Sequence, residues 1–105
     1  MKLEVGMYVR TLNGIAKIDK IQDNVMKDTK GYLHYGDFVK ASYNIIDILE
    51  EGDYVNGSWV NEIVDGKPIH KDYNDPYYSF GWENEDIKSV ITHEQMEQMA
   101  YKVGE

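Results

Sequence analysis

Residues 4–21 decide the fold of the first half of the chain: positions 4–12 read EVGMYVRTL, positions 13–14 read NG, and positions 15–21 read IAKIDKI. Both flanking segments are rich in residues that favour strands, and apolar and polar side chains alternate in part. An Asn-Gly pair between two such segments favours a tight turn, because these residues tolerate a positive φ. The sequence therefore predicts a β-hairpin near the start of the chain.

A second stretch repeats this pattern. Positions 51–55 read EGDYV, and another Asn-Gly pair at 56–57 separates them from SWVNEIV at 58–64. The Gly-x-Tyr-Val segment of residues 6–9 thus recurs at residues 52–55. Repetition at this spacing indicates two copies of one small structural unit, with chance similarity between two β-rich segments as the alternative.

Each half is predicted to end in a short helix. Asn44 is a candidate N-cap for residues 45–49, whereas Thr92 and Gln95 form a capping-box pattern ahead of the last helix. One face of that helix carries an apolar stripe, which we expect to pack on the core. The stripe consists of Met96, Met99, Ala100 and Val103.

These patterns together favour a mainly β fold with short helices. We expect two SH3-like small-barrel pseudo-repeats packed together as one compact unit, with a short C-terminal helix. The first repeat would span residues 1–49 and the second residues 50–105. A half of this size would be marginally stable alone, so the two halves should pack against each other.

Composition excludes several classes of protein. The 105 residues include 11 basic and 19 acidic side chains, and the net charge of −8 argues against binding bare nucleic acid or an anionic membrane. No cysteine is present, which excludes disulfides and thiolate metal sites. There is neither a signal-peptide pattern nor an apolar run long enough to span a membrane, so we expect a cytoplasmic protein.

Catalytic chemistry is weakly represented. His34, His70 and His93 fall in three different predicted elements without the spacing of metal ligands. The adjacent carboxylates Glu50 and Glu51 are expected to be solvated charges. The sequence therefore predicts no catalytic residue, no metal site and no cofactor, and we do not expect an enzyme.

The acidity is concentrated in the second half. Residues 1–52 carry 8 acidic and 7 basic side chains, a balance of −1, whereas residues 53–105 carry 11 and 4, a balance of −7. Carboxylates spaced among aromatic rings can imitate a nucleic acid and attract a basic protein, although the rings could equally fill a small core. The candidate partner-binding residues are Asp72, Asp75, Tyr77, Tyr78, Trp82, Glu83, Glu85 and Asp86.

Three segments carry a resemblance to a family. Residues 1–11, residues 39–57 and residues 84–103 resemble small proteins of phages and prophages in Firmicutes, with the loops at 22–30 and 66–76 as the divergent parts. The resemblance implies a counter-defence role, and in particular a type II-A anti-CRISPR inhibitor of Cas9. The partner would then be Cas9 or its complex with guide RNA, a basic nucleic-acid-handling protein, with the acidic residues taking the place of DNA.

Two other functions fit the sequence. The protein could sequester a nucleotide signal of host immunity, with tyrosines stacking on the base. The charges for its phosphates would come from Arg10, Lys17, Lys20 and Lys40. Alternatively, the protein could be an adaptor without enzymatic activity that binds partners through the edges of its sheets.

Overall fold

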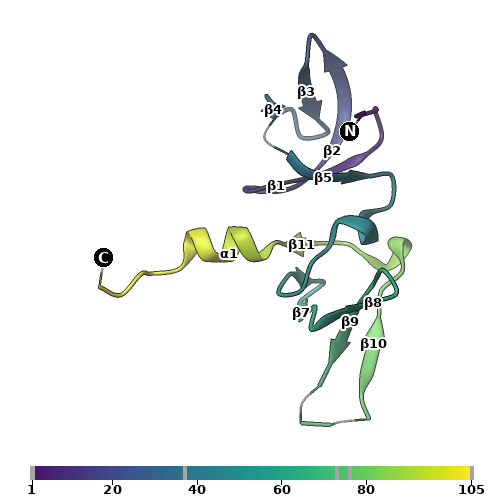
Figure 1. Ribbon diagram of the computed structural model, residues 1–105, viewed down its shortest axis with the longest axis vertical. Helices are drawn as coiled ribbons and strands as arrows, with labels where there is room; N and C mark the ends of the chain where they lie inside the picture. Colours follow the sequence, from purple (N-terminus) through teal and green to yellow (C-terminus); the bar gives the residue numbers. More distant parts are fainter. Residues whose placement is uncertain (1, 37, 73, 76, 105) are drawn as a thin grey trace.

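The computed structural model describes residues 2–36, 38–72, 74–75 and 77–104, and it is mainly β with a short C-terminal helix (Figure 1). The first half forms one antiparallel sheet in the order β4-β3-β2-β1-β5. Its strands are β1 (Tyr8–Thr11), β2 (Gly14–Gln22), β3 (Val25–Asp28), β4 (Leu33–His34) and β5 (Phe38–Ser42).

The predicted N-terminal hairpin is confirmed. Strands β1 and β2 pair with Val9 opposite Ala16 and Thr11 opposite Gly14. The Thr11 hydroxyl donates a hydrogen bond to the carbonyl of Gly14 at 3.1 Å, which closes the turn. Gly14 has a φ of +124°, and a Cβ at this position would lie within 3.0 Å of the Gln95 side chain. The turn thus requires glycine both for its backbone conformation and for the approach of the C-terminal helix.

The second half contains two smaller antiparallel sheets, in the orders β11-β6-β7 and β10-β9-β8. The turns at Asn56-Gly57 and Asp65-Gly66 have a positive φ at both residues, as tight hairpins require. The strands are β6 (Tyr54–Val55), β7 (Ser58–Trp59), β8 (Glu62–Val64), β9 (Lys67–Lys71), β10 (Ser79–Gly81) and β11 (Val90–Ile91).

Each half has an equivalent backbone hydrogen bond near its first residues. The amide of Gly6 donates to the carbonyl of Ile18 at 2.9 Å, and the amide of Gly52 donates to the carbonyl of Val60 at the same distance. Both glycines have a φ near +90°. In each half the last strand, β5 or β11, returns to pair with the first, β1 or β6. The expected closed barrels do not form, because in the described residues the outer strands of each sheet remain unpaired.

Three short helical segments complete the fold: the 3₁₀ helices η1 (Ile45–Ile48) and η2 (Asn84–Asp86), and the helix α1 (His93–Met99). The capping box of Thr92 and Gln95 is confirmed. Asn44, by contrast, caps nothing with its side chain, which accepts a hydrogen bond from Asn84 instead. None of the helices in the described ranges is both long and apolar enough to cross a membrane.

Two small cores lie on either side of η1. The first is built on Val9, Ile18 and Met26. The second is built on Leu49, Val55, Val60 and Trp82, and Ile15 of the first half packs against it. The side chain of Ile15 thus gives the two halves an apolar contact, as expected for units too small to be stable alone.

The apolar stripe predicted for the C-terminal helix does not pack on the core. Helix α1 ends at Met99, because Ala100 adopts an extended backbone with ψ of 139°. Met99 is 72% exposed and Val103 is 89% exposed, while only Met96 is half-buried. The expectation was wrong because it extended the helical period past the true end of the helix. In Figure 1 the C-terminal segment projects away from both halves.

Candidate functional site

A buried arginine lies at the junction of the two halves. Arg10 points inward from β1, and its side chain is 0% exposed. Its guanidinium donates five hydrogen bonds: two to the carboxylate of Asp53, at 2.6 and 2.7 Å, two to the carboxylate of Glu94, at 2.7 and 3.0 Å, and one to the carbonyl of Ile48, at 2.9 Å. All five N–H donors of the group are therefore used, which is the condition for burying a guanidinium at tolerable cost.

Asp53 is the matching anion on the second half, and it is also fully buried. Besides the two bonds from Arg10, its carboxylate accepts hydrogen bonds from the backbone amides of Glu50 at 2.8 Å and His93 at 3.0 Å. One carboxylate thus ties together β1, the segment after η1 and the start of α1. Burial alone would lower the pKa of Arg10, but the hydrogen bonds that it donates to Asp53 and Glu94 raise it above its ordinary value.

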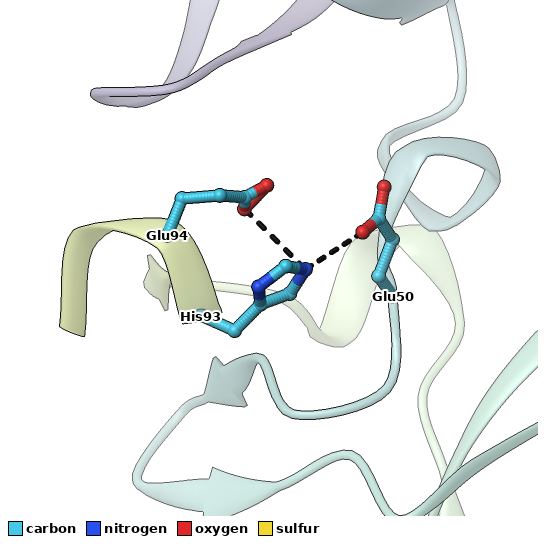
Figure 2. Close-up of side chains that lie close together, drawn as sticks. All are labelled: Glu50, His93 and Glu94. Carbon is cyan, nitrogen blue, oxygen red and sulfur yellow. Dashed lines mark hydrogen bonds and ion pairs between the residues drawn. The ribbon is translucent and has the colours of Figure 1, made fainter. Parts of the chain in front are cut away.

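Figure 2 shows the outer part of this cluster, where His93 lies between Glu50 and Glu94. The ring atom Nε2 of His93 is 2.7 Å from Glu50 and 3.5 Å from Glu94. The second oxygen of Glu50 lies 2.9 Å from the amine of Lys40 and 3.4 Å from Arg10. The cluster therefore alternates positive and negative groups from its buried centre to the solvent.

These contacts shift two further pKa values. Burial would raise the pKa of Glu50, but hydrogen bonds from His93 and Lys40 and the charge of Arg10 lower it to about 2. The hydrogen bond to Glu50, opposed by burial, raises the pKa of His93. Glu50 is thus a carboxylate at neutral pH, and the pair favours a proton on His93.

Glu50, His93 and Glu94 have the spacing of a metal site, because one ligand atom from each lies within 4.8 Å of the others. The contacts do not favour a cation there. Both oxygens of Glu94 already accept hydrogen bonds from Arg10, and both oxygens of Glu50 face His93 or Lys40. A metal ion would have to displace these positive groups. The ion pairs of the cluster instead join the two halves, and we call the cluster the salt-bridge lock. It consists of Arg10, Lys40, Glu50, Asp53, His93 and Glu94.

The predicted partner-binding residues fall into two groups at the ends of one strand. Asp72, Asp75, Tyr77 and Tyr78 lie between β9 and β10, at the tip of the hairpin (Figure 1). Glu83, Glu85 and Asp86 lie beyond the other end of β10, at η2. Five residues of extended chain from Tyr78 to Glu83 correspond to about 17 Å, so the structure does not gather all the carboxylates at one point.

The three aromatic candidates differ in exposure. Tyr77 is 96% exposed and Tyr78 is 52% exposed, so both rings are available to a partner. Trp82 is only 5% exposed and belongs to the second core, where its ring packs against Phe80 at a centroid distance of 5.0 Å. Trp82 therefore does not act as a surface anchor in this structure. For this residue the alternative interpretation holds, in which an aromatic ring fills a small core.

Several acidic candidates have structural partners. The carboxylates of Asp72 and Asp75 accept backbone hydrogen bonds within the turn. Glu83 pairs with Lys67 at 2.8 Å, and Asp86 takes part in the capping box of η2. Within the described residues, Asp72, Asp75, Glu85 and Asp86 form no ion pair, so most of their negative charge remains unneutralised at the surface.

Sequence reasoning missed the cluster around Arg10. Arg10 was a candidate for phosphate binding and Glu50 was expected to be solvated, yet the first is buried and the second is held by three positive groups. The one available signal was that Arg10 is the only arginine in the chain and lies in a predicted strand, directly after the apolar Val9. Its partners Asp53 and Glu94 are 43 and 84 residues away, and no pattern links them.

Comparisons with known proteins gave no match to any family model, curated protein or solved structure.

Proposed function

We propose that the protein is a non-enzymatic counter-defence protein of phage type, which binds a basic nucleic-acid-handling protein through the acidic surface of its second half. The observation that carries the proposal is the set of carboxylates at the two ends of β10 that form no ion pair within the described residues, with Tyr77 and Tyr78 beside two of them. They are Asp72, which is half-buried, and the exposed Asp75, Glu85 and Asp86. The partner implied by the phage resemblance is Cas9 or its complex with guide RNA, in the cytoplasm of the infected cell.

Charge supports this choice of partner. Ion pairs account for only four of the acidic side chains described between residues 53 and 104. They are Asp53, Glu62, Glu83 and Glu94. Of the other carboxylates, Asp72, Asp75, Glu85 and Asp86 leave a negative field at both ends of β10, which would steer a cationic channel towards the protein and exclude DNA from it.

The exposed tyrosines would add contact area. A tyrosine buries a large ring at a small cost in side-chain entropy, and such rings are common at the centre of protein interfaces. Tyr77 and Tyr78 lie two and three positions after Asp75, so a ring and a charge can reach one surface of a partner together.

We further propose that the two halves are copies of one open SH3-like unit. Glu4 and Glu50 each lie two positions before the glycine that starts a half. The hydroxyl of Tyr43 donates to Glu4, and the ring of His93 bonds to Glu50. In the second half, the 3₁₀ helix η2 lies between β10 and the last strand, β11. In this arrangement the second copy carries the acidic surface and the first supports it.

The test is a DNA-cleavage assay with the Cas9–guide RNA complex and increasing amounts of the protein. We expect inhibition that weakens with added salt, because the charges are exposed. The variant carrying Asp72→Asn, Asp75→Asn, Glu85→Gln and Asp86→Asn should inhibit at least roughly tenfold less well. These amides keep an oxygen that can accept the hydrogen bonds of the turn and of η2.

A matched control removes exposed carboxylates elsewhere. Asp19→Asn with Asp23→Asn, Glu51→Gln and Glu97→Gln changes four exposed acidic side chains that have no hydrogen bond or ion pair within the described residues. This variant should inhibit as the parent protein does. Failure of the parent to bind the Cas9 complex would reject that partner, and full inhibition by the fourfold variant would reject the acidic surface as the means of binding. Binding only to phage proteins would favour an adaptor.

A further inference from the structure

A groove with a volume of about 410 Å³ opens between the two halves. Residues of β1, β2 and the turn after β3 form one wall, and residues 87–90 of the second half form the other. Ile45 of η1 also lines the groove. The volume falls in the range typical of small-molecule sites, and such sites often lie between two packed units.

The groove is basic although the chain is acidic. Three lysines line it, and Asp28 is its one acidic residue among those described. The lysines are Lys17, Lys30 and Lys88. The local balance is thus +2, against −8 for the whole chain. A concave surface of this sign concentrates small anions.

The one carboxylate of the groove already has donors. Asp28 is 6% exposed and accepts hydrogen bonds from the amides of Lys30 and Tyr32, at 2.9 and 3.0 Å, and pairs with the ring of His34 at 2.9 Å. Burial would raise the pKa of Asp28, but the bonds from His34 and these amides lower it. Because Asp28 is already hydrogen-bonded to these donors, it does not neutralise the lysines, and their ammonium groups remain available to bind an anion.

The contacts of the lysines agree with this. Within the described part of the chain, neither Lys17 nor Lys30 forms an ion pair with a carboxylate. The amine of Lys17 lies 5.4 Å from the centre of the Tyr8 ring. The amine of Lys88 donates to the backbone carbonyl of Glu85 at 3.1 Å, a contact that leaves its charge unneutralised.

Apart from Thr29 and Ser89, the rest of the lining is apolar or aromatic. Ile15, Ile45, Ile87 and Val90 face the groove together with Tyr8. Such a wall suits a flat ring, whereas the three ammonium groups suit phosphate oxygens. A ligand that carries both a planar ring and phosphate groups matches the two kinds of lining at once.

We propose that this groove binds a nucleoside phosphate, with Lys17, Lys30 and Lys88 on the phosphates and the base against Tyr8 and the isoleucines. The groove adjoins the η2 end of the acidic surface through Lys88, but none of the candidate partner-binding residues lines it, so the proposal does not depend on the proposed partner. It differs from the arrangement expected from the sequence, because Arg10 is buried and Lys40 is paired with Glu50. Of the residues expected there, Lys17 lines this groove, whereas Lys20 lines a different one.

The groove also continues along the chain. A neighbouring hollow of about 420 Å³ shares Ile15, Ala16, Asp28, Lys30 and Val90 with it, and extends towards Gln95 of α1. A ligand bound in the first groove would contact both halves and should therefore stabilise the whole fold.

The experiment measures thermal stability and two-dimensional NMR spectra with ADP, GDP, CDP and UDP, each added up to roughly 10 mM. At least one of them should raise Tm in a saturable way and shift the signals of Tyr8, Ile15 and Ile87. Adenosine and pyrophosphate serve as the two halves of the ligand, and each should bind at least roughly tenfold more weakly than the best nucleotide.

The decisive variant is Lys17→Gln with Lys30→Gln and Lys88→Gln. All three side chains are exposed, so the fold should survive, and nucleotide affinity should fall at least roughly tenfold. The matched control, Lys2→Gln with Lys27→Gln and Lys102→Gln, removes the same charge outside the groove and should bind as the parent does.

Three results would overturn the proposal. The first is no saturable shift with any of the four nucleotides. The second is equal loss of affinity in the triple variant and the control, which would indicate attraction by overall charge alone. The third is pyrophosphate binding as tightly as the best nucleotide, since the ring would then contribute nothing.

Discussion

Asp53→Asn tests whether the salt-bridge lock holds the two halves together. The substitution keeps the shape of the side chain but replaces a charged acceptor with a neutral amide. The carboxylate of Asp53 accepts four hydrogen bonds, two from Arg10 and one each from the amides of Glu50 and His93. An asparagine oxygen can keep only part of this set, because its NH₂ group faces N–H donors.

The expected loss is large for a chain of this length. Removing one partner of a buried pair leaves an uncompensated charge and costs about 3–5 kcal/mol. The whole free energy of unfolding of a domain is about 5–15 kcal/mol, so the variant should lose roughly a fifth of its stability or more. Glu94 still neutralises Arg10 in part, which favours the lower end of the range.

Urea unfolding followed by tryptophan fluorescence measures this loss, since Trp82 is buried in the second core. Lys67→Met is the control, because it breaks an exposed pair with Glu83 and should leave the unfolding midpoint nearly unchanged. A double variant, Arg10→Met with Asp53→Leu, should be less destabilised than the sum of its single variants. A loss below about 1 kcal/mol for Asp53→Asn would refute the view that this pair is buried and coupled.

Three further predictions concern pH, backbone and capping. The stability contributed by His93 should be complete below pH 6.5 and disappear as pH rises through its raised pKa, whereas the contribution of Glu50 should be complete above pH 4.5 and disappear as pH falls towards 2. Urea unfolding midpoints measured across pH should therefore fall at both the acid and the alkaline end, and His93→Gln should remove the alkaline fall. Gly14→Ala should cost about 1–3 kcal/mol in chemical unfolding, because the positive φ and the contact with the C-terminal helix both oppose a side chain, and unchanged stability would contradict the geometry of the turn. Thr92→Val should cost about 1 kcal/mol and reduce the helical signal in circular dichroism, since the buried hydroxyl accepts the amide of Gln95 at 3.2 Å; an unaltered spectrum would argue against the capping box.

Local patterns predicted much of the fold. The Asn-Gly and Asp-Gly turns lie where the sequence places them, because residues with a positive φ at these positions are sufficient to define a hairpin. The capping box at Thr92 was readable for the same reason, since its two side chains are three residues apart. The open sheets were not predicted, because closure depends on contacts between strands far apart in the chain.

The charged cluster was not readable from the sequence because its members are distant from one another. Arg10, Asp53 and Glu94 meet only after β1, η1 and α1 have packed, and each looks like an ordinary surface charge in its own segment. The lysines of the groove pose the same difficulty, since Lys17 and Lys88 come from different halves. The burial of Trp82 was not predicted for a different reason. Alternation of acidic and aromatic residues does not by itself show which ring packs into the core.

The inward direction of Arg10 has a consequence for how such a protein can change over generations. Its guanidinium belongs to one half and both of its carboxylates to the other. A first half expressed alone would have to expose this cation to water or leave it unbalanced, and a second half would carry two acids without their counterpart. Recombination between related genes should therefore preserve the three side chains as a set, and a crossover that separates them should yield chains that fail to accumulate in the cell.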